Sequence, residues 1–493
     1  MKACWLLLVT GTLATPAAAA PSPVPPDPAN SVIAWAPGLE AERARLDRAC
    51  RGRRAPCGLP VLVKDNIDIA GMVTTAGSRA LLANLRSADA PLVARLRRAG
   101  LLILGKTNLS EWANFRASAS ISGWSGVGGQ TRNPHVLDRN PCGSSSGSGA
   151  AVAAGVAPAA IGTETNGSIT CPAAVNGIVG LKPTVGLVSR TGIVPISHSQ
   201  DTAGPMAIDV ETTARLLTVI AGSDPADPAT READRRRTDY AAGLAGASLK
   251  GVRLGVLRFA TGWSPPVDSA FEAALETLRR EGAILVDIAD VPDRRAIGEA
   301  ELQVLLSEFK AGVNTYLSTT PPAVRSRTLA DVIAFNRADS ARTLGLFGQD
   351  LLERAEATAG LDDPAYLAAR ATSLKLAAGW LEAAFKTHRV EALLAPTAPP
   401  AWKIDAVNGD QAPFGGAPGL AAVAGTPHLT VPLARHLGLP LGLSFLGPAW
   451  SEARLLQLGA AWERARGPLP PPAFRPSLET APEVAPLFQP MPR

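Results

Sequence analysis

Short apolar runs that suit β-strands alternate along this chain with segments whose apolar spacing suits helices. In the first block, from Leu59 to about Ala221, the expected strands are 59–63 and 101–105, and the expected helices are 91–99 and 150–160. A strand-helix-strand pattern follows at 251–257, 269–281 and 283–288, then a mainly helical region at 296–388, strands at 429–433 and 441–446, and a helix at 451–464. This alternation predicts an α/β fold with a mixed, mostly parallel central sheet flanked by helices.

Length and composition permit one large α/β core or two domains, and the absence of internal repeats favours one domain. The chain has 493 residues, of which 46% are hydrophobic, so it can bury a sizeable core. We expect a single domain at 31–470, with a C-terminal tail at 471–493. The formal charge of +5 is small for this length, only 5% of residues are aromatic, and arginines are mixed with acids. Nucleic acid is therefore not an expected partner.

The N-terminus has the pattern of an export signal. Lys2 precedes an apolar run that ends near Leu13, and Pro16 and four alanines follow. The run is too short to span a bilayer, so we expect a cleavable signal peptide at 1–19 and no stable membrane anchor. Five prolines between Pro21 and Pro28 predict an extended tether at 20–30. The expected location is periplasmic or secreted.

Four cysteines lie beyond the signal segment: Cys50, Cys57, Cys142 and Cys171. Export permits disulfides, and a Cys50–Cys57 bond would close a short loop. Cys142 and Cys171 each lie within three residues of a serine of interest, but neither has a histidine beside it. We interpret them as packing residues and leave a second disulfide open. The sequence contains no His-Glu-x-x-His and no paired Cys-x-x-Cys, so neither a metal nor a cofactor is expected.

Two short stretches, residues 142–149 and 164–172, and one lysine carry the chemical signal. Lys64 ends an apolar run, Ser144 lies 80 residues further on, and Ser168 follows Ser144 by 24 residues. A serine hydroxyl attacks an amide only when a base removes its proton. None of the five histidines lies in a Gly-x-Ser-x-Gly context. A buried lysine is an alternative base, because burial lowers its pKa and favours its neutral form.

In this order and spacing, the three elements resemble the amidase signature family, whose members cut amide bonds with a Ser–Ser–Lys triad. The similarity runs from about Ser31 to about Arg466. The resemblance implies that Ser168 forms an acyl-enzyme. It also implies that Ser144, which follows a cis peptide bond in the family, relays the proton to Lys64.

The resemblance also assigns groups around the triad. Its implied oxyanion hole consists of the backbone N–H groups of Thr165, Asn166, Gly167 and Ser168. Its implied supporting residues are Ser145 and Asp201. In many relatives an arginine follows the nucleophile by two residues, whereas this chain has Thr170. That substitution removes one candidate partner for a substrate carboxylate.

The segments 161–206 and 307–314 look closest to the peptide amidase subgroup, which deamidates the C-terminal amide of peptides and spares internal peptide bonds. The implied partners are a peptide or small-molecule amide and water. Family members generally carry some 60 further residues of helices before the segment resembling 31–47. We therefore expect a domain with shortened N-terminal helices. Loss of these helices would expose apolar core surface, and a homodimer contact or a shortened fold would compensate for it. An inactive or unstable relative is one alternative, and the glutaminase subunit of a tRNA-dependent amidotransferase is another.

One motif competes with this interpretation. Residues 100–107 match the phosphate-loop pattern G-x4-G-K-[ST]. A phosphate loop follows a strand, but four consecutive large aliphatic residues predict that this stretch is itself the strand. Nucleotide binding is therefore not expected.

Overall fold

The computed structural model describes residues 25–52, 56–412, 415–417 and 419–489. The predicted signal peptide at 1–19 lies outside these residues, as does the part of the predicted tether before residue 25. Within the described ranges, no helix is long and apolar enough to cross a membrane.

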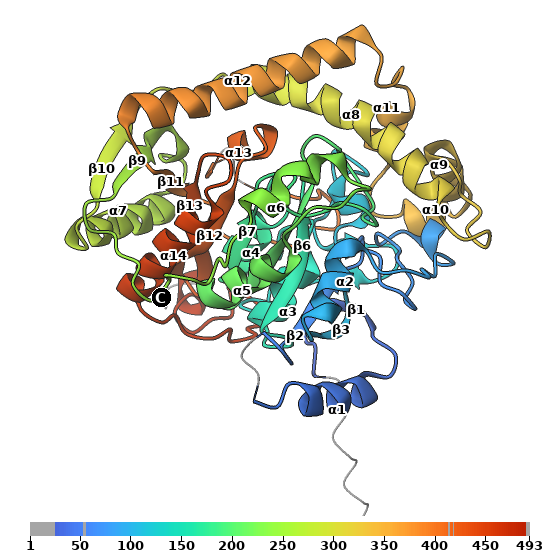
Figure 1. The fold of residues 1–493 in the computed structure, drawn as a ribbon, viewed down its shortest axis with the longest axis horizontal. Coiled ribbons are helices and arrows are strands. Elements are labelled where there is room, and N and C mark those ends of the chain that lie inside the picture. Colours follow the sequence, from blue (N-terminus) through green and yellow to red (C-terminus); the bar gives the residue numbers. More distant parts are fainter. Residues whose placement is uncertain (1–24, 53–55, 413–414, 418, 490–493) are drawn as a thin grey trace, which may run out of the picture.

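An eleven-stranded sheet forms the centre of the described fold (Figure 1), with the strand order β1-β3-β2-β6-β8-β7-β12-β13-β11-β9-β10. Its strands are β1 (Val32–Trp35), β2 (Pro60–Lys64), β3 (Leu102–Thr107), β6 (Ala159–Glu164), β7 (Val179–Lys182), β8 (Thr202–Ala207), β9 (Arg253–Leu257), β10 (Ile284–Ile288), β11 (Ala392–Pro396), β12 (His428–His436) and β13 (Leu439–Leu446). A second, two-stranded sheet consists of β4 (Trp124–Ser125) and β5 (Gly129–Gln130).

The large sheet is mixed. Parallel ladders join β2 to β3 and β6, and β9 to β10 and β11. The other six ladders between described neighbours are antiparallel, and they include the hairpin of β12 and β13. The parallel ladders arise where a helix returns the chain across the sheet, as α7 (Pro265–Arg280) does between β9 and β10. The predicted α/β fold with a mixed central sheet flanked by helices is confirmed.

Different helices cover the two faces of the sheet. Besides α7 they are α1 (Leu39–Ala49), α2 (Pro91–Arg98), α3 (Ser146–Ala153), α4 (Thr170–Asn176), α5 (Val210–Ile220), α6 (Ala233–Arg236), α13 (Leu420–Val423) and α14 (Glu452–Arg466). In β2, Val61 and Val63 pack in the apolar cluster of α2, α5, α7 and α14. Leu62 packs in the cluster of α1, α3 and α4 on the opposite face. This alternation is the ordinary geometry of a strand buried on both sides.

The predicted helical region at 296–388 forms a separate layer. Its helices are α8 (Arg294–Ser318), α9 (Leu329–Ala338), α10 (Ser340–Thr343), α11 (Asp350–Glu356) and α12 (Pro364–His388). The long helices α8 and α12 lie side by side along the top of the view in Figure 1. Phe309 of α8 packs with Trp112 and Phe115, so this layer is anchored to the loop that follows β3.

Two predicted segments differ from the structure. The run 150–160 was expected to be helical, but it contains the end of α3, a turn at Gly155 and the beginning of β6. Gly155 has φ +76°, a left-handed conformation that ends a helix. The helix expected from residue 269 begins at Pro265, because proline fits the first turn, where no N–H is needed.

Two disulfides join the four cysteines. The Cys50–Cys57 bond, which the sequence permitted without settling, is present, and its Cα atoms lie 5.5 Å apart. Cys142–Cys171 also forms, with its Cα atoms 6.0 Å apart, so of the two interpretations left open by the sequence, packing residues or a second disulfide, the structure shows the disulfide. Cys142 has a left-handed backbone at φ 58° and precedes the serine-rich run, while Cys171 lies in the first turn of α4. The fold brings together two segments that are 29 residues apart in sequence.

The segment that matches the phosphate-loop pattern, residues 100–107, lies in the core. Residues 102–107 are the fully buried strand β3, as its aliphatic residues predicted. Lys106 is fully buried and forms an ion pair with Asp65, with 2.8 Å between Nζ and Oδ1. The lysine of this motif is therefore already paired inside the sheet.

Candidate active site

Lys64 lies at the carboxyl end of β2 and points into a polar pocket inside the fold. Its Nζ lies 2.8 Å from Ser144 Oγ, 2.8 Å from Thr163 Oγ1 and 3.3 Å from the Thr163 carbonyl oxygen. The side chain is fully buried. β2 is an interior strand between β3 and β6, and the apolar residues before Lys64 are buried with it.

Burial changes the protonation of this lysine. Removal from water disfavours the ammonium form and lowers the pKa of Lys64 from 10.5 to about 7, although the carboxylates of Asp201 and Glu164 act in the opposite direction. A lysine with a pKa near 7 is neutral in a large fraction of molecules at neutral pH. It can therefore accept a proton from the Ser144 hydroxyl that it contacts.

The first serine-rich run brings Ser144 to the lysine and connects it to the second run. The Gly143–Ser144 peptide bond is cis. A Cβ atom at Gly143 would lie 2.2 Å from Ser110 Oγ, so only glycine fits there. Ser145 donates its hydroxyl to the Thr163 carbonyl at 3.0 Å, and its N–H donates to the Ser168 carbonyl at 3.1 Å. Ser145 thus joins the stretch of residues 142–149 to that of residues 164–172, as a supporting residue would.

The turn after β6 presents unused backbone donors. Within the described chain, the N–H groups of residues 166–168 have no hydrogen-bond acceptor. Gly167 has φ +85°, and no atom lies within 4 Å of the position of an added Cβ. The Glu164 carboxylate accepts from the N–H groups of Ile169 at 2.7 Å and Thr170 at 2.9 Å, which satisfies the next two donors. The free N–H groups can stabilise an oxyanion.

Ser168 lies in this turn, close to the surface of the site. Its side chain is nearly buried, with 8% of the residue exposed. Its hydroxyl makes no hydrogen bond to any residue that the structure describes, including Ser144. The structure therefore brings Lys64 and Ser144 into direct contact and leaves the Ser168 hydroxyl free.

Asp201 holds the turn from the other side. Thr165 Oγ1 donates to Asp201 Oδ1 at 2.6 Å, and the N–H groups of Ile196 and Ser197 donate to Oδ2 at 2.8 and 2.9 Å. Burial raises the pKa of Asp201 to about 6, and the hydrogen bond from Thr165 acts against that rise. The carboxylate links the turn of residues 165–168 to the loop of residues 189–201.

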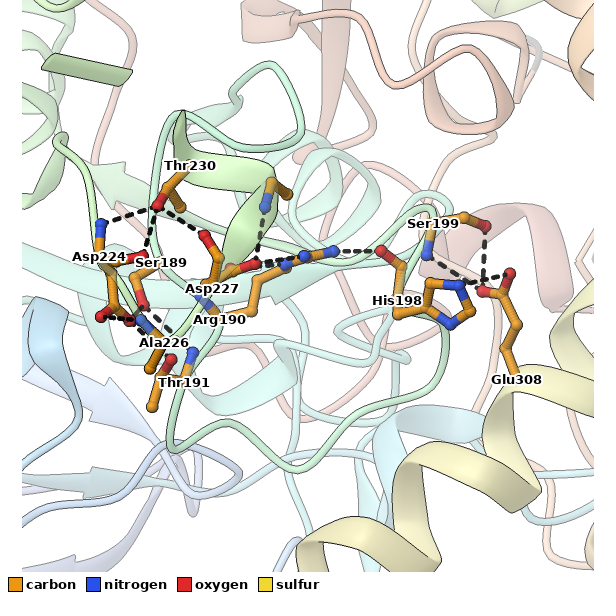
Figure 2. Close-up of polar contacts among 11 residues, drawn as sticks. Ser189, Arg190, Thr191, His198, Ser199, Asp224, Ala226, Asp227, Thr230 and Glu308 are labelled. Atoms are coloured by element: carbon orange, nitrogen blue, oxygen red, sulfur yellow. Dashed lines mark hydrogen bonds and ion pairs between the residues drawn. The ribbon is translucent and has the colours of Figure 1, made fainter. Parts of the chain in front are cut away.

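That loop is itself held at two points (Figure 2). Arg190 forms an ion pair with Asp227, with 2.5 Å between Nη2 and Oδ1, and donates another hydrogen bond to the His198 carbonyl. On the other side, the Glu308 carboxylate accepts from the N–H of Ser199 at 3.1 Å and from its hydroxyl at 3.0 Å. These contacts come from distant parts of the chain. Sequence reasoning missed them, because no local pattern marks either residue of the Arg190–Asp227 pair.

Thr170 does not face the surface of the site. It is 2% exposed, and its hydroxyl donates to Glu164 Oε2 at 3.2 Å. The threonine is the first residue of α4, and its hydroxyl is held by Glu164. It supplies no positive charge to a substrate.

A cavity of about 640 Å³ adjoins the site on the side of the lysine. Its inner wall includes Asn66, Thr163, Thr165 and Asp201, whereas neither Ser144 nor Ser168 lines it. Asn66 donates to Thr163 Oγ1 at 3.0 Å, so a short polar chain leads from the cavity to Lys64. In the described part of the chain, no group of three or more His, Cys, Asp or Glu side chains could hold a metal ion.

Comparison with known proteins identifies the family. The sequence model of the family described as Amidase matches residues 28–456, so the chain belongs to the amidase family. The protein is thus an amide hydrolase of the amidase signature class, as its serine-rich motifs predicted.

Similar proteins refine this assignment. The chain is 52% identical to the native peptide amidase from Stenotrophomonas maltophilia, whose crystal structure superposes with a TM-score of 0.84 over 90% of this chain and 91% of that chain. It is 38% identical to a probable amidase from Arabidopsis thaliana, over 85% of this chain and 78% of that protein. It is 37% identical to a glutamyl-tRNA(Gln) amidotransferase subunit from Roseiflexus castenholzii, over 88% of each. The expected resemblance to peptide amidases is confirmed.

Proposed function

We propose that this amidase works through a Ser–cisSer–Lys triad of Ser168, Ser144 and Lys64. The observation that carries the proposal is the buried contact of 2.8 Å between Lys64 Nζ and Ser144 Oγ, next to a turn with free backbone N–H groups. A neutral lysine, a relaying hydroxyl and an anion-stabilising turn are the parts that serine-dependent amide hydrolysis requires.

In the proposed reaction, Ser168 Oγ attacks the amide carbonyl carbon while its proton passes to Ser144, and the Ser144 proton passes to Lys64. The carbonyl oxygen becomes an oxyanion, which accepts hydrogen bonds from the N–H groups of residues 166–168. The tetrahedral intermediate then collapses as the lysine returns a proton through Ser144 to the leaving nitrogen. Ammonia or an amine departs, and water hydrolyses the ester on Ser168 by the same route.

We propose C-terminal peptide amides or small amides as substrates. The 52% identity to a peptide amidase, over nine-tenths of both chains, supports this class. The test is ammonia release from a panel of C-terminally amidated peptides, simple aryl amides and glutamine. It uses the chain from Ala20 beside its Ser168→Ala form.

The panel distinguishes the candidate functions. Release from peptide amides by the parent alone supports the proposal. Preference for glutamine, together with copurifying partner proteins, would favour the glutaminase alternative, whose motivation is the 37% identity to the amidotransferase. If the folded parent releases ammonia from none of these amides, the result would favour the alternative that this protein is an inactive member of the family.

We also propose that the protein is exported. The N-terminal pattern of Lys2 and an apolar run supports export, and so do two disulfides, which persist in oxidising compartments. Cell fractionation and N-terminal sequencing provide the test. A full-length protein retained in the reducing cytoplasm would contradict the proposal.

A further inference from the structure

A carboxylate from α8 reaches the turn that carries the proposed nucleophile. Asn166 Nδ2 donates to Glu301 Oε1 at 2.8 Å, and Gln200 Nε2 donates to the same oxygen at 2.8 Å. Asn166 is exposed and lies two residues before Ser168, while Glu301 is partly buried. Glu301 therefore lies at the rim of the proposed active site, between its two loops.

Among the described residues, no cation neutralises this carboxylate. Both hydrogen-bond donors to Glu301 are neutral amides, and it has no ion pair with any Lys, Arg or His that the structure describes. Its second oxygen, Oε2, accepts no hydrogen bond from the described residues. Two carboxylates around the neighbouring cavity differ in this respect, since Asp68 pairs with Arg86 and Asp227 pairs with Arg190, whereas Asp201 on the cavity wall also accepts only from neutral donors of the described chain.

The position two residues after Ser168 carries no charge in this chain. It is Thr170, the first residue of α4, whose hydroxyl donates to Glu164. A substrate bound to Ser168 therefore meets a negative charge at one edge of the site. Charges near a protein surface interact appreciably over several ångströms, because the effective dielectric constant there is far below that of water.

We propose that Glu301 is a specificity-determining residue. It favours amides with a neutral or cationic group near the scissile carbonyl and disfavours amides with a carboxylate there. This inference rests on the proposed function.

The test is the Glu301→Gln variant, which removes the charge and keeps the size of the side chain and an oxygen that can accept from both amides. The substrates are three N-acetylated amino acid amides of similar size, those of lysine, norleucine and glutamate, with the glutamate side chain left as a free carboxylate. We expect the parent to prefer the lysine amide over the glutamate amide. The variant should reduce that ratio of kcat/KM by about tenfold, with the norleucine amide nearly unchanged.

Glu299→Gln is the matched control. Glu299 lies on the same helix, its side chain is 66% exposed, and it pairs with Arg295 on the helix surface. Its substitution should leave the ratio unchanged. An unchanged ratio in Glu301→Gln would overturn the inference. An equal loss on all three amides would also overturn it, because Glu301 would then position the turn without selecting charge.

The two proposals fail in different ways. If the parent hydrolyses the norleucine amide but Glu301→Gln keeps the parental ratio, only the inference about Glu301 fails. If the parent hydrolyses none of the three amides, and nothing in the wider panel, the proposed function fails and the inference fails with it.

Discussion

Replacing Lys64 by methionine tests whether the proposed base is neutral in the folded protein. A lysine with a pKa of 10.5 in the unfolded chain and about 7 in the folded chain loses its proton on folding at any pH between these values. The unfolded state then binds more protons, so this lysine destabilises the fold near pH 7, and the destabilisation shrinks as pH rises toward 10.5. Compared with a lysine whose pKa does not change on folding, Lys64 lowers the free energy of unfolding by about 4 kcal/mol at pH 7 and by about 1.4 kcal/mol at pH 9.5.

The measurement is the free energy of unfolding in urea at pH 7 and pH 9.5, with both disulfides intact and tryptophan fluorescence as the signal. Methionine has a similar length and no titrating group. The stability of the parent relative to Lys64→Met should therefore increase by about 3 kcal/mol between the two pH values. The exposed Lys250→Met is the control and should show no such change. A constant difference between parent and Lys64→Met would show that Lys64 keeps its proton on folding, which would refute its role as a neutral base.

Three further substitutions test residues that hold the proposed active site in place. Replacing both Cys142 and Cys171 by serine opens a loop of 29 residues and should cost about 3–4 kcal/mol of unfolding free energy in urea; a loss below about 1 kcal/mol would contradict this. Gly167→Ala meets no neighbour within 4 Å, but it must adopt φ +85°, so it should cost about 1 kcal/mol and lower kcat. Unchanged kcat would argue against the turn as the oxyanion hole. Asp201→Ala removes the acceptor of Thr165 and should lower kcat at least about tenfold with little change in KM; a change confined to KM would assign Asp201 to substrate binding.

The parts of the fold that depend on local pattern could be predicted from the sequence. The apolar run before Lys64 predicted a buried strand and a lysine without access to water, and both are found. The aliphatic residues of β3 correctly argued against a phosphate loop. The six antiparallel ladders could not be anticipated from the alternation of strands and helices, because strand order depends on contacts between distant segments.

The same distinction holds for the site. Ser144 and Ser168 were found because each lies in a motif that resembles a known family. Glu301 was not found, because it lies 135 residues from Asn166, on a long helix whose sequence gives no sign of its neighbours. The sequence left the Cys142–Cys171 disulfide open for a similar reason, since sequence separation alone does not reveal which cysteines lie close together.

The most direct test of the triad is covalent labelling with a fluorophosphonate, a reagent that reacts with an activated serine. Peptide mapping by mass spectrometry locates the label, and the labelling rate is followed from pH 5.5 to pH 9. We predict a single label on Ser168, with a rate that falls as pH decreases through about 7, where Lys64 gains its proton. The rate should be strongly reduced in Lys64→Met. A label on another residue, or a rate on Ser168 that is independent of both pH and Lys64, would contradict this mechanism.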